Sequence, residues 1–218
     1  VAVNNDGRRK HSFHAPSWEA QVALIQAAHR DAQVRPSAVS LVEAHGTGTI
    51  LGDAVEVTAL REVFRDAEGK AECSLGSVKS SIGHANTAAG AMGLLKVMLC
   101  LTHRKLVPSL HLEKPNPNLQ LEETPFRLQT SAEEWVSPSS PRRHGRVAGV
   151  SSFGVGGTNV HLVVEEALET PGSLPSEEPV LLVVSAATET AATKLARAVA
   201  DQIDAGVNLP DLEYSITT

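Results

Sequence analysis

One segment of this chain constrains its fold more than any other, because it predicts a helix without a polar face. Such a helix must be covered on every side. The segment is shorter than the ~20 apolar residues that a bilayer span requires. We therefore expect it to lie inside a large core and not in a membrane. The helix is expected from Thr87 to about His103, with apolar residues at Met92, Leu94, Leu95, Val97, Met98, Leu99 and Leu101.

The composition indicates a globular protein of ordinary size. Its 218 residues, 42% of them hydrophobic, can bury a core without disulfides. The formal net charge of −6 argues against a nucleic acid or an anionic membrane as partner, since binding to either would rest on excess Lys and Arg. Cys73 and Cys100 lie in apolar contexts, which indicates a reducing, cytoplasmic location. Because the chain opens at Val1 within a strand pattern, we expect it to be part of a longer protein.

Hydrophobic periodicity predicts strands that alternate with helices, which indicates an α/β fold. Ser17 is expected to cap the first helix, and Asp53 with Glu56 resembles a capping box for the second. Six of the 12 prolines fall within 108–141, which predicts an irregular stretch. The expected helices span 17–30, a segment from about 53, 87–103 and a segment from about 189; the expected strands span 39–44, 73–78, 147–152, 159–166 and 180–184.

Two histidines occupy similar junctions between expected elements. His45 ends a strand and opens the sequence His-Gly-Thr-Gly-Thr, and His84 precedes the apolar helix. Ligands collect at the carboxyl ends of strands in open α/β sheets, so we expect His45 and His84 to lie close together and to face one pocket with the FGVGG turn of 153–157. The glycines allow a close approach of backbone to ligand, and Thr47 and Thr49 offer hydroxyl groups. The alternative is that both histidines are half-buried structural residues in turns.

Lys79 and a glycine-rich turn, 153–159, are further candidates. Lys79 precedes His84 closely and is suited to binding a carboxylate or tuning an imidazole; otherwise it is a solvated lysine. Successive N–H groups of the turn FGVGGTN can form an oxyanion nest; otherwise the turn is a tight hairpin. His11 and His14 form the closest histidine pair, but without an acidic or cysteine partner we expect no metal site.

Three motifs taken together are far more specific than any one of them. They are VEAHGTGTILGDAVEV (42–57), GSVKSSIGHANTAAG (76–90) and SSFGVGGTNVHLVVEE (151–166). In this order and spacing, the chain resembles the C-terminal half of a β-ketoacyl synthase (ketosynthase) of the kind found in modular polyketide synthases. The PSLH of 108–111 and the PNP of 115–117 match that family as well.

The resemblance divides the chain into three parts. Residues 1–166 are similar to the C-terminal half of a ketosynthase, and 167–179 have the composition of a linker. Residues 180–218 resemble the start of the small α/β linker domain that leads toward an acyltransferase. The implied fold is thiolase-like, an αβαβα sandwich of two similar halves that forms a homodimer.

The resemblance also implies roles for individual residues. His45 and His84 match the histidines that stabilise the enolate formed when malonyl-carrier protein loses carbon dioxide. Lys79 matches the lysine that orients this region through an ion pair, for which Glu56 is the expected partner. The remaining matches are Thr47 and Thr49, which bind the phosphopantetheine arm, and Phe153 and Val155, in the loop that gates the pocket and supplies an oxyanion N–H.

The implied partners are an N-terminal ketosynthase half, an acyl carrier protein and a neighbouring acyltransferase domain. No cofactor is expected on this segment, because the substrates arrive on the phosphopantetheine of the carrier protein. The nucleophilic cysteine of the family lies upstream, and neither Cys73 nor Cys100 occupies an exposed, electropositive turn. The position of Ala54 often holds proline in the family.

The function implied by the resemblance is that of an acyltransferase performing a decarboxylative Claisen condensation, with this chain as its C-terminal part. Two alternatives stay open at this point. One is a non-catalytic half that is retained for scaffolding. The other is a decarboxylase-type ketosynthase that lacks the cysteine.

Overall fold

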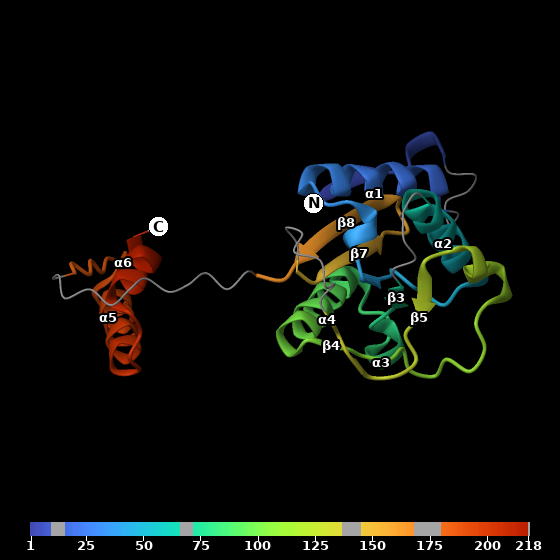
Figure 1. Ribbon diagram of the computed structural model, residues 1–218. Coiled ribbons are helices and arrows are strands. Elements are labelled where there is room, and N and C mark those ends of the chain that lie inside the picture. Colours follow the sequence, from blue (N-terminus) through green and yellow to red (C-terminus); the bar gives the residue numbers. More distant parts are fainter. Residues whose placement is uncertain (10–15, 66–71, 137–144, 168–179, 218) are drawn as a thin grey trace. The chain divides into compact units, whose positions relative to one another are not determined.

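The computed structural model describes residues 1–9, 16–65, 72–136, 145–167 and 180–217. The chain divides into two compact units, Val1–Ala167 and Leu168–Thr218 (Figure 1). No described helix has the length and apolar character needed to cross a membrane.

The first unit is built on one mixed six-stranded sheet with the strand order β1-β8-β7-β2-β3-β5. The four strands from β7 to β5 run parallel, whereas β8 is antiparallel to both β7 and β1. The strands are β1 (Ala2–Asn5), β2 (Leu41–Glu43), β3 (Cys73–Gly76), β5 (Phe126–Leu128), β7 (Val147–Phe153) and β8 (Thr158–Glu165).

Helices cover both faces of this sheet (Figure 1). On one face, α1 (Trp18–Ala32) and α2 (Ile50–Phe64) pack over Val42 and its neighbours. On the other face, α4 (Ala89–His103) packs over Leu41. Because successive side chains of a strand point to opposite faces, adjacent residues of β2 serve two separate cores. The unit is therefore a three-layer α/β/α arrangement, and the predicted α/β class is confirmed.

The helix starts agree with the sequence in one case and differ in another. Ser17 caps α1 as predicted, since its hydroxyl accepts the Ala20 N–H. The cap predicted at Asp53 is wrong: Thr49 caps α2, and its Oγ1 accepts the Gly52 N–H at 3.2 Å. Thr and Asp are both good caps, so the local sequence does not decide between them. Asp53 lies instead in the first turn of α2, where a carboxylate is favourable.

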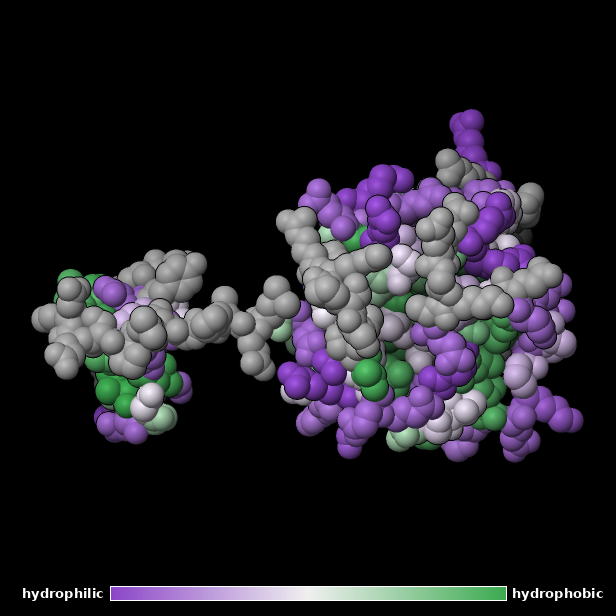
Figure 2. All heavy atoms as spheres, in the orientation of Figure 1, coloured by the Kyte–Doolittle hydropathy of each residue, from purple (hydrophilic) through white to green (hydrophobic). Residues whose placement is uncertain are grey.

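The apolar helix α4 is buried on one side only within this unit. Its residues against the sheet are Ala89, Gly93, Val97 and Cys100. On its outer face, Leu95, Met98 and Leu99 are 47%, 51% and 50% exposed. The expectation of burial all round is therefore not met within the described part of the chain, where a single sheet supports the helix. Apolar side chains also reach the surface of this unit between hydrophilic ones on the face seen in Figure 2.

The proline-rich stretch is more regular than the sequence predicts. It contributes β5, which extends the main sheet by pairing with β3. A second, two-stranded sheet joins β4 (Lys105–Leu106) to β6 (Glu133–Glu134). These strands are two or three residues long, too short to show a period in sequence. Short 3₁₀ turns lie at Gly7–Arg9, Pro36–Ala38, Asn86–Ala88, Pro117–Leu119 and Leu121–Glu123.

The described residues of the second unit, 180–217, form two helices, α5 (Glu189–Asp204) and α6 (Leu209–Thr217). The helix predicted from about Glu189 is confirmed, and Thr188 caps it. The strand predicted at 180–184 is wrong: no strand occurs among the described residues of this unit. A strand needs a partner for its backbone groups, and α5 and α6 offer none. Leu181, 73% exposed, shows that the segment is not packed.

Candidate active site

Two of the sequence-predicted residues meet at one end of the parallel strands. His45 follows the end of β2, and His84 follows α3 (Lys79–Ile82), which begins just after β3. Gly83 between α3 and His84 has φ 75°, a left-handed conformation that reverses the chain. The two imidazole rings lie 5.8 Å apart, centre to centre, and nearly perpendicular. The predicted proximity of His45 and His84 is therefore confirmed.

The loop between β7 and β8 closes the same place. The ring of Phe153 lies 5.6 Å from that of His45. Together with the histidines, this loop lines a cavity of about 350 Å³. Gly154 and Gly157 direct their N–H groups to oxygens within the turn itself. The sequence-predicted residues that line the cavity are His45, Thr47, Thr49, Glu56, His84, Phe153 and Val155.

A neighbouring backbone group determines which ring nitrogen of His84 accepts a hydrogen bond. The Asn86 N–H donates to Nδ1 of His84 at 3.0 Å, so Nδ1 carries no proton. In the neutral imidazole the proton then lies on Nε2, which is a donor. Asn86 itself is left-handed, with φ 50°, a conformation that asparagine tolerates better than most residues. The site thus holds one imidazole in a defined tautomer.

His45 is neutral near physiological pH. Its burial, with smaller electrostatic contributions from Lys79 and His84, lowers its pKa to about 4. A neutral imidazole retains one N–H donor and does not repel a second histidine. Each imidazole can therefore offer an N–H donor, and both side chains line the same cavity.

Glu56 holds the backbone of His45 in place. Its carboxylate accepts the N–H groups of His45 at 2.7 Å and Gly46 at 3.0 Å. Complete burial raises the pKa of Glu56 to about 7, although these two hydrogen bonds oppose the shift. The resemblance predicted Glu56 as the ion-pair partner of Lys79. The hydrogen-bond donors to the Glu56 carboxylate are instead backbone groups of the histidine loop.

Lys79 is half-buried beside this loop. Among the described residues it forms no ion pair with Glu56, so the predicted contact is wrong. Burial lowers the pKa of Lys79, and the negative charges of Glu56, Glu43 and Asp53, in that order, oppose the shift. The lysine therefore interacts with several carboxylates through space.

The two threonines lie at the exposed rim of the cavity. Their Oγ1 atoms are 3.2 Å apart, and Oγ1 of Thr49 also accepts the Gly52 N–H. Gly48 between them donates its N–H to Asp53. The loop is thus held by hydrogen bonds to two carboxylates, that of the buried Glu56 and that of Asp53. Its two threonine hydroxyl groups lie on the solvent-exposed side.

Sequence reasoning missed one pair of charged residues behind the histidines. Glu43, the last residue of β2, is 1% exposed and pairs with Lys96 of α4 at 2.6 Å. The available signal was a glutamate directly after two apolar residues of a buried strand, and a lysine within an apolar helix. A charge is rarely buried without a partner, so each of the two residues implied the other.

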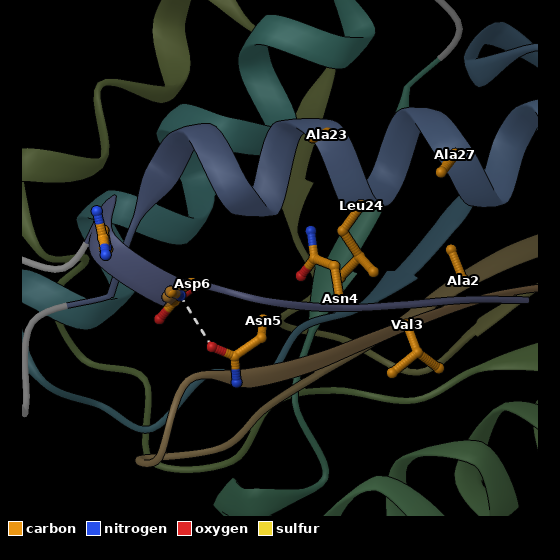
Figure 3. A pocket seen from close by; sticks show the side chains of 10 residues that line it. Ala2, Val3, Asn4, Asn5, Asp6, Ala23, Leu24 and Ala27 are labelled. Carbon is orange, nitrogen blue, oxygen red and sulfur yellow. Dashed lines mark hydrogen bonds between the residues drawn. The ribbon is translucent and has the colours of Figure 1, made fainter.

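Neither cysteine has the character of a nucleophile. Cys73 and Cys100 are buried free thiols, and burial raises the pKa of both. Within the described residues, no group of three or more potential metal ligands occurs; His11 and His14 lie outside them. A larger cavity of about 530 Å³ runs along β1 and α1, lined by residues such as Asn5 and Leu24 (Figure 3). It has neither histidine of the candidate site in its lining.

Solved ketosynthase structures share this arrangement of elements. An oxazolomycin ketosynthase domain of Streptomyces albus is 40% identical, with a TM-score of 0.74 over 92% of this chain and 35% of its own. The ketosynthase from module 6 of the bacillaene synthase of Bacillus subtilis is 35% identical, with a TM-score of 0.70 over 99% of this chain and 37% of its own. The fold is therefore thiolase-like.

Curated relatives share this likeness in sequence. Polyketide synthase PksN of Bacillus subtilis is 40% identical over 99% of this chain, which spans 4% of that protein. Polyketide synthase ThaG of Burkholderia thailandensis is 49% identical over 76% of this chain, which spans 3% of that protein. The chain thus corresponds to a small part of each of these long proteins.

Two family models match in succession. The model "Beta-ketoacyl synthase, C-terminal domain" matches residues 1–113, and "Ketoacyl-synthetase C-terminal extension" matches 115–215. The chain belongs to the β-ketoacyl synthase family of condensing enzymes and corresponds to the C-terminal half of a polyketide synthase ketosynthase. The junction of the two models falls inside the first compact unit, because β5, β7 and β8 come after it in sequence but belong to the main sheet.

Proposed function

We propose that this chain supplies the decarboxylation half of a β-ketoacyl synthase of the acyltransferase class. Joined to an N-terminal half with a nucleophilic cysteine, it would condense a malonyl-type extender on a carrier protein with an acyl chain. The observation that carries the proposal is the pair of imidazoles, His45 and His84, whose ring centres lie 5.8 Å apart in one cavity.

The proposed chemistry needs hydrogen-bond donors where negative charge develops. When the bond between Cα and the carboxylate of a malonyl thioester breaks, carbon dioxide leaves and the electron pair forms an enolate. His45 and the Nε2–H of His84 donate to the enolate oxygen, a role that suits fixed donors in a partly buried site. The enolate carbon then attacks the acyl thioester on the cysteine of the N-terminal half, a C–C bond forms, and the thiolate leaves.

The remaining residues serve binding and positioning in this proposal. Thr47 and Thr49 offer hydroxyl groups to the phosphopantetheine arm at the cavity rim. Phe153 and Val155 gate the pocket, and the loop that bears them supplies an oxyanion N–H. Lys79 contributes positive charge beside the histidine loop. The segment binds no cofactor of its own, because its substrates are carried by phosphopantetheine.

The proposal names four partners and a location. The partners are the N-terminal ketosynthase half, an acyl carrier protein, a neighbouring acyltransferase domain and a second copy of the ketosynthase in a homodimer. The match to a C-terminal extension model over 115–215 supports a position within a multidomain chain. The free thiols Cys73 and Cys100 suit the reducing cytoplasm, where we place the enzyme.

One alternative function is decarboxylation without condensation. If the N-terminal half also lacked a reactive cysteine, the two histidines would still release carbon dioxide from malonyl-carrier protein, but no acyl chain would be bound. Condensation and decarboxylation must therefore be measured separately.

The test combines this chain with an N-terminal ketosynthase half and measures carbon dioxide released from malonyl-carrier protein. We expect His45→Ala and His84→Ala each to lower the rate about 100-fold or more, the usual effect of losing one oxyanion donor. His111→Asn is the matched control, since His111 is exposed and its left-handed backbone (φ 60°) suits asparagine. Full activity in either alanine variant would falsify the proposal.

A further inference from the structure

The buried pair of Glu43 and Lys96 joins two elements that the candidate site needs. Oε2 of Glu43 at the end of β2 lies 2.6 Å from Nζ of Lys96 on α4. The two side chains are 1% and 10% exposed. Burial raises the pKa of Glu43, and among the groups that oppose this shift Lys96 is the strongest. The lysine thus offsets the cost of placing a carboxylate inside the core.

The second oxygen of Glu43 reaches the turn that carries Lys79. Oε1 accepts the N–H of Val78 at 2.5 Å. Val78 is the N-cap residue of α3, directly before Lys79, and α3 leads through Gly83 to His84. Glu43 itself lies two residues before His45. One carboxylate therefore ties the strand that ends at the first histidine to the turn that leads to the second.

The surrounding backbone leaves room for this pair. A Cβ added to Gly93 would lie 3.2 Å from Cγ of Glu43, and one added to Gly76 would lie 3.3 Å from Nζ of Lys96. Both distances are tighter than ordinary carbon contacts. Glycine at these two positions, one on α4 and one at the end of β3, is what admits the two side chains into the layer between sheet and helix.

Glu43 and Glu56 each bind a different backbone segment of the candidate site. Glu56 binds the N–H groups of His45 and Gly46, whereas Glu43 binds the turn of Lys79. The β2–β3 pairing ends at Glu43 and Gly76, with one further bond from the Ala44 N–H to the Gly76 carbonyl. Beyond that point, the hydrogen bond from Val78 to Glu43 fixes the chain after β3 against the chain after β2.

We infer that Glu43 is a positioning residue that sets the turn of Lys79 and His84 relative to His45 through its hydrogen bond with the Val78 N–H, while Lys96 only balances its charge. The inference rests on the proposed function, because it assigns the pair a role in that site. The Glu43 side chain thus makes two separable contributions to the site, an oxygen that accepts the Val78 N–H and a negative charge that Lys96 balances.

Two double variants separate these contributions without leaving a lone charge in the core. Glu43→Gln/Lys96→Met removes both charges but keeps an oxygen that accepts the Val78 N–H. Glu43→Ala/Lys96→Met removes the charges and the acceptor. Because both members of the ion pair are replaced together, neither variant leaves an unpaired charge in the core, and we expect both assemblies with an N-terminal half to stay folded. Thermal unfolding of each assembly checks this.

The two variants should differ in catalysis. We expect Glu43→Gln/Lys96→Met to keep kcat for malonyl-carrier protein decarboxylation within about threefold, and Glu43→Ala/Lys96→Met to lose about 10- to 100-fold, the effect of a small misplacement of catalytic groups. KM should change little in both, because the carrier arm binds elsewhere. Equal kcat values for the two folded variants would overturn the inference.

A spectroscopic readout distinguishes failure of the inference from failure of the proposed function. With ¹³C-labelled histidine in this chain, the ring signals of His45 and His84 should shift in Glu43→Ala/Lys96→Met and stay in place in Glu43→Gln/Lys96→Met. Suppose that the unaltered assembly shows no decarboxylation, but the histidine ring signals shift only in Glu43→Ala/Lys96→Met. In that case the proposed function fails and the positioning role of Glu43 stands. If the ring signals of His45 and His84 shift in neither variant, the positioning role of Glu43 fails, regardless of the decarboxylation rates that are measured.

Discussion

At the scale of single residues, a second histidine pair lies within the core between α1 and β8. Nδ1 of His161 lies 2.9 Å from Oγ of Ser151, and Nδ1 of His29 donates to the Val34 carbonyl at the same distance. The ring centres of the two histidines are 6.1 Å apart. Burial, with a smaller contribution from His29, lowers the pKa of His161 to about 3, and burial also lowers that of His29. Both imidazoles are therefore neutral in the fold.

This pair predicts acid sensitivity. Because the folded pKa values lie below the unfolded value of 6.5, the unfolded chain binds more protons below that pH. The contribution of the two histidines to the free energy of unfolding is fully present above pH 6.5. It falls as the pH drops toward 3, by up to about 1.4 kcal/mol per pH unit for each histidine. His161→Gln should flatten the dependence of the urea midpoint on pH between 6.5 and 4.5 in the assembled ketosynthase, and the surface variant His111→Asn should not.

The comparison of variants is needed because Glu56 acts in the opposite direction. Its folded pKa of about 7 lies above the usual value of a glutamate, so its contribution grows as the pH falls from 7 toward 4.5. The total pH dependence mixes both effects, but the difference between His161→Gln and the unaltered protein isolates the histidine. An identical slope in the two proteins would contradict the prediction.

At the scale of elements, the start of α2 is a testable case. Thr49 accepts the Gly52 N–H in the first turn of this helix, which carries Glu56 beneath the histidine loop. We expect Thr49→Ala to lower the stability of the assembled ketosynthase by about 1 kcal/mol, the typical value of an N-cap, and Thr49→Ser to retain most of it. The measurement is the urea midpoint. If alanine and serine behave alike, the hydroxyl does not cap the helix.

The sequence predicted the long elements well because their periods span several turns or strand pairs. The starts of α1 and α5 and the neighbouring strands β7 and β8 are where it placed them within a few residues. The candidate site followed from motifs at strand ends, since parallel strands bring their carboxyl ends to one edge. His45 and His84 therefore met as expected, without any knowledge of the sheet order.

The errors arise where the outcome depends on contacts distant in sequence. β5 is a strand because β3 offers it a free edge, and 180–184 is not one because the described part of its unit offers no edge. Lys79 does not contact Glu56, whose carboxylate accepts two backbone N–H groups of the histidine loop instead. The Glu43–Lys96 pair spans β2 and α4, elements whose adjacency the local sequence did not reveal.

At the scale of the whole molecule, the outer face of α4 exposes a group of large apolar side chains on the first unit. Leu95, Met98 and Leu99 are each about half exposed, and Ile82 and Val107 adjoin the same apolar groove. Large exposed apolar patches on a folded unit mark surfaces that another part covers. The chain spans only 35% to 37% of the ketosynthase structures it resembles. We therefore expect the N-terminal half of a ketosynthase to cover this face.

The last prediction concerns this face in the isolated chain. Alone, the 218-residue chain should bind an apolar dye strongly and show no condensing activity, and adding an N-terminal half should abolish dye binding and give a monodisperse complex. Met98→Lys should weaken that assembly about 10-fold or more, since it buries an unpaired charge. Leu181→Lys, an equally large change at an exposed position of the second unit, is the matched control and should assemble normally. An isolated chain that is monomeric, unfolds cooperatively and binds no dye would show that α4 needs no further cover.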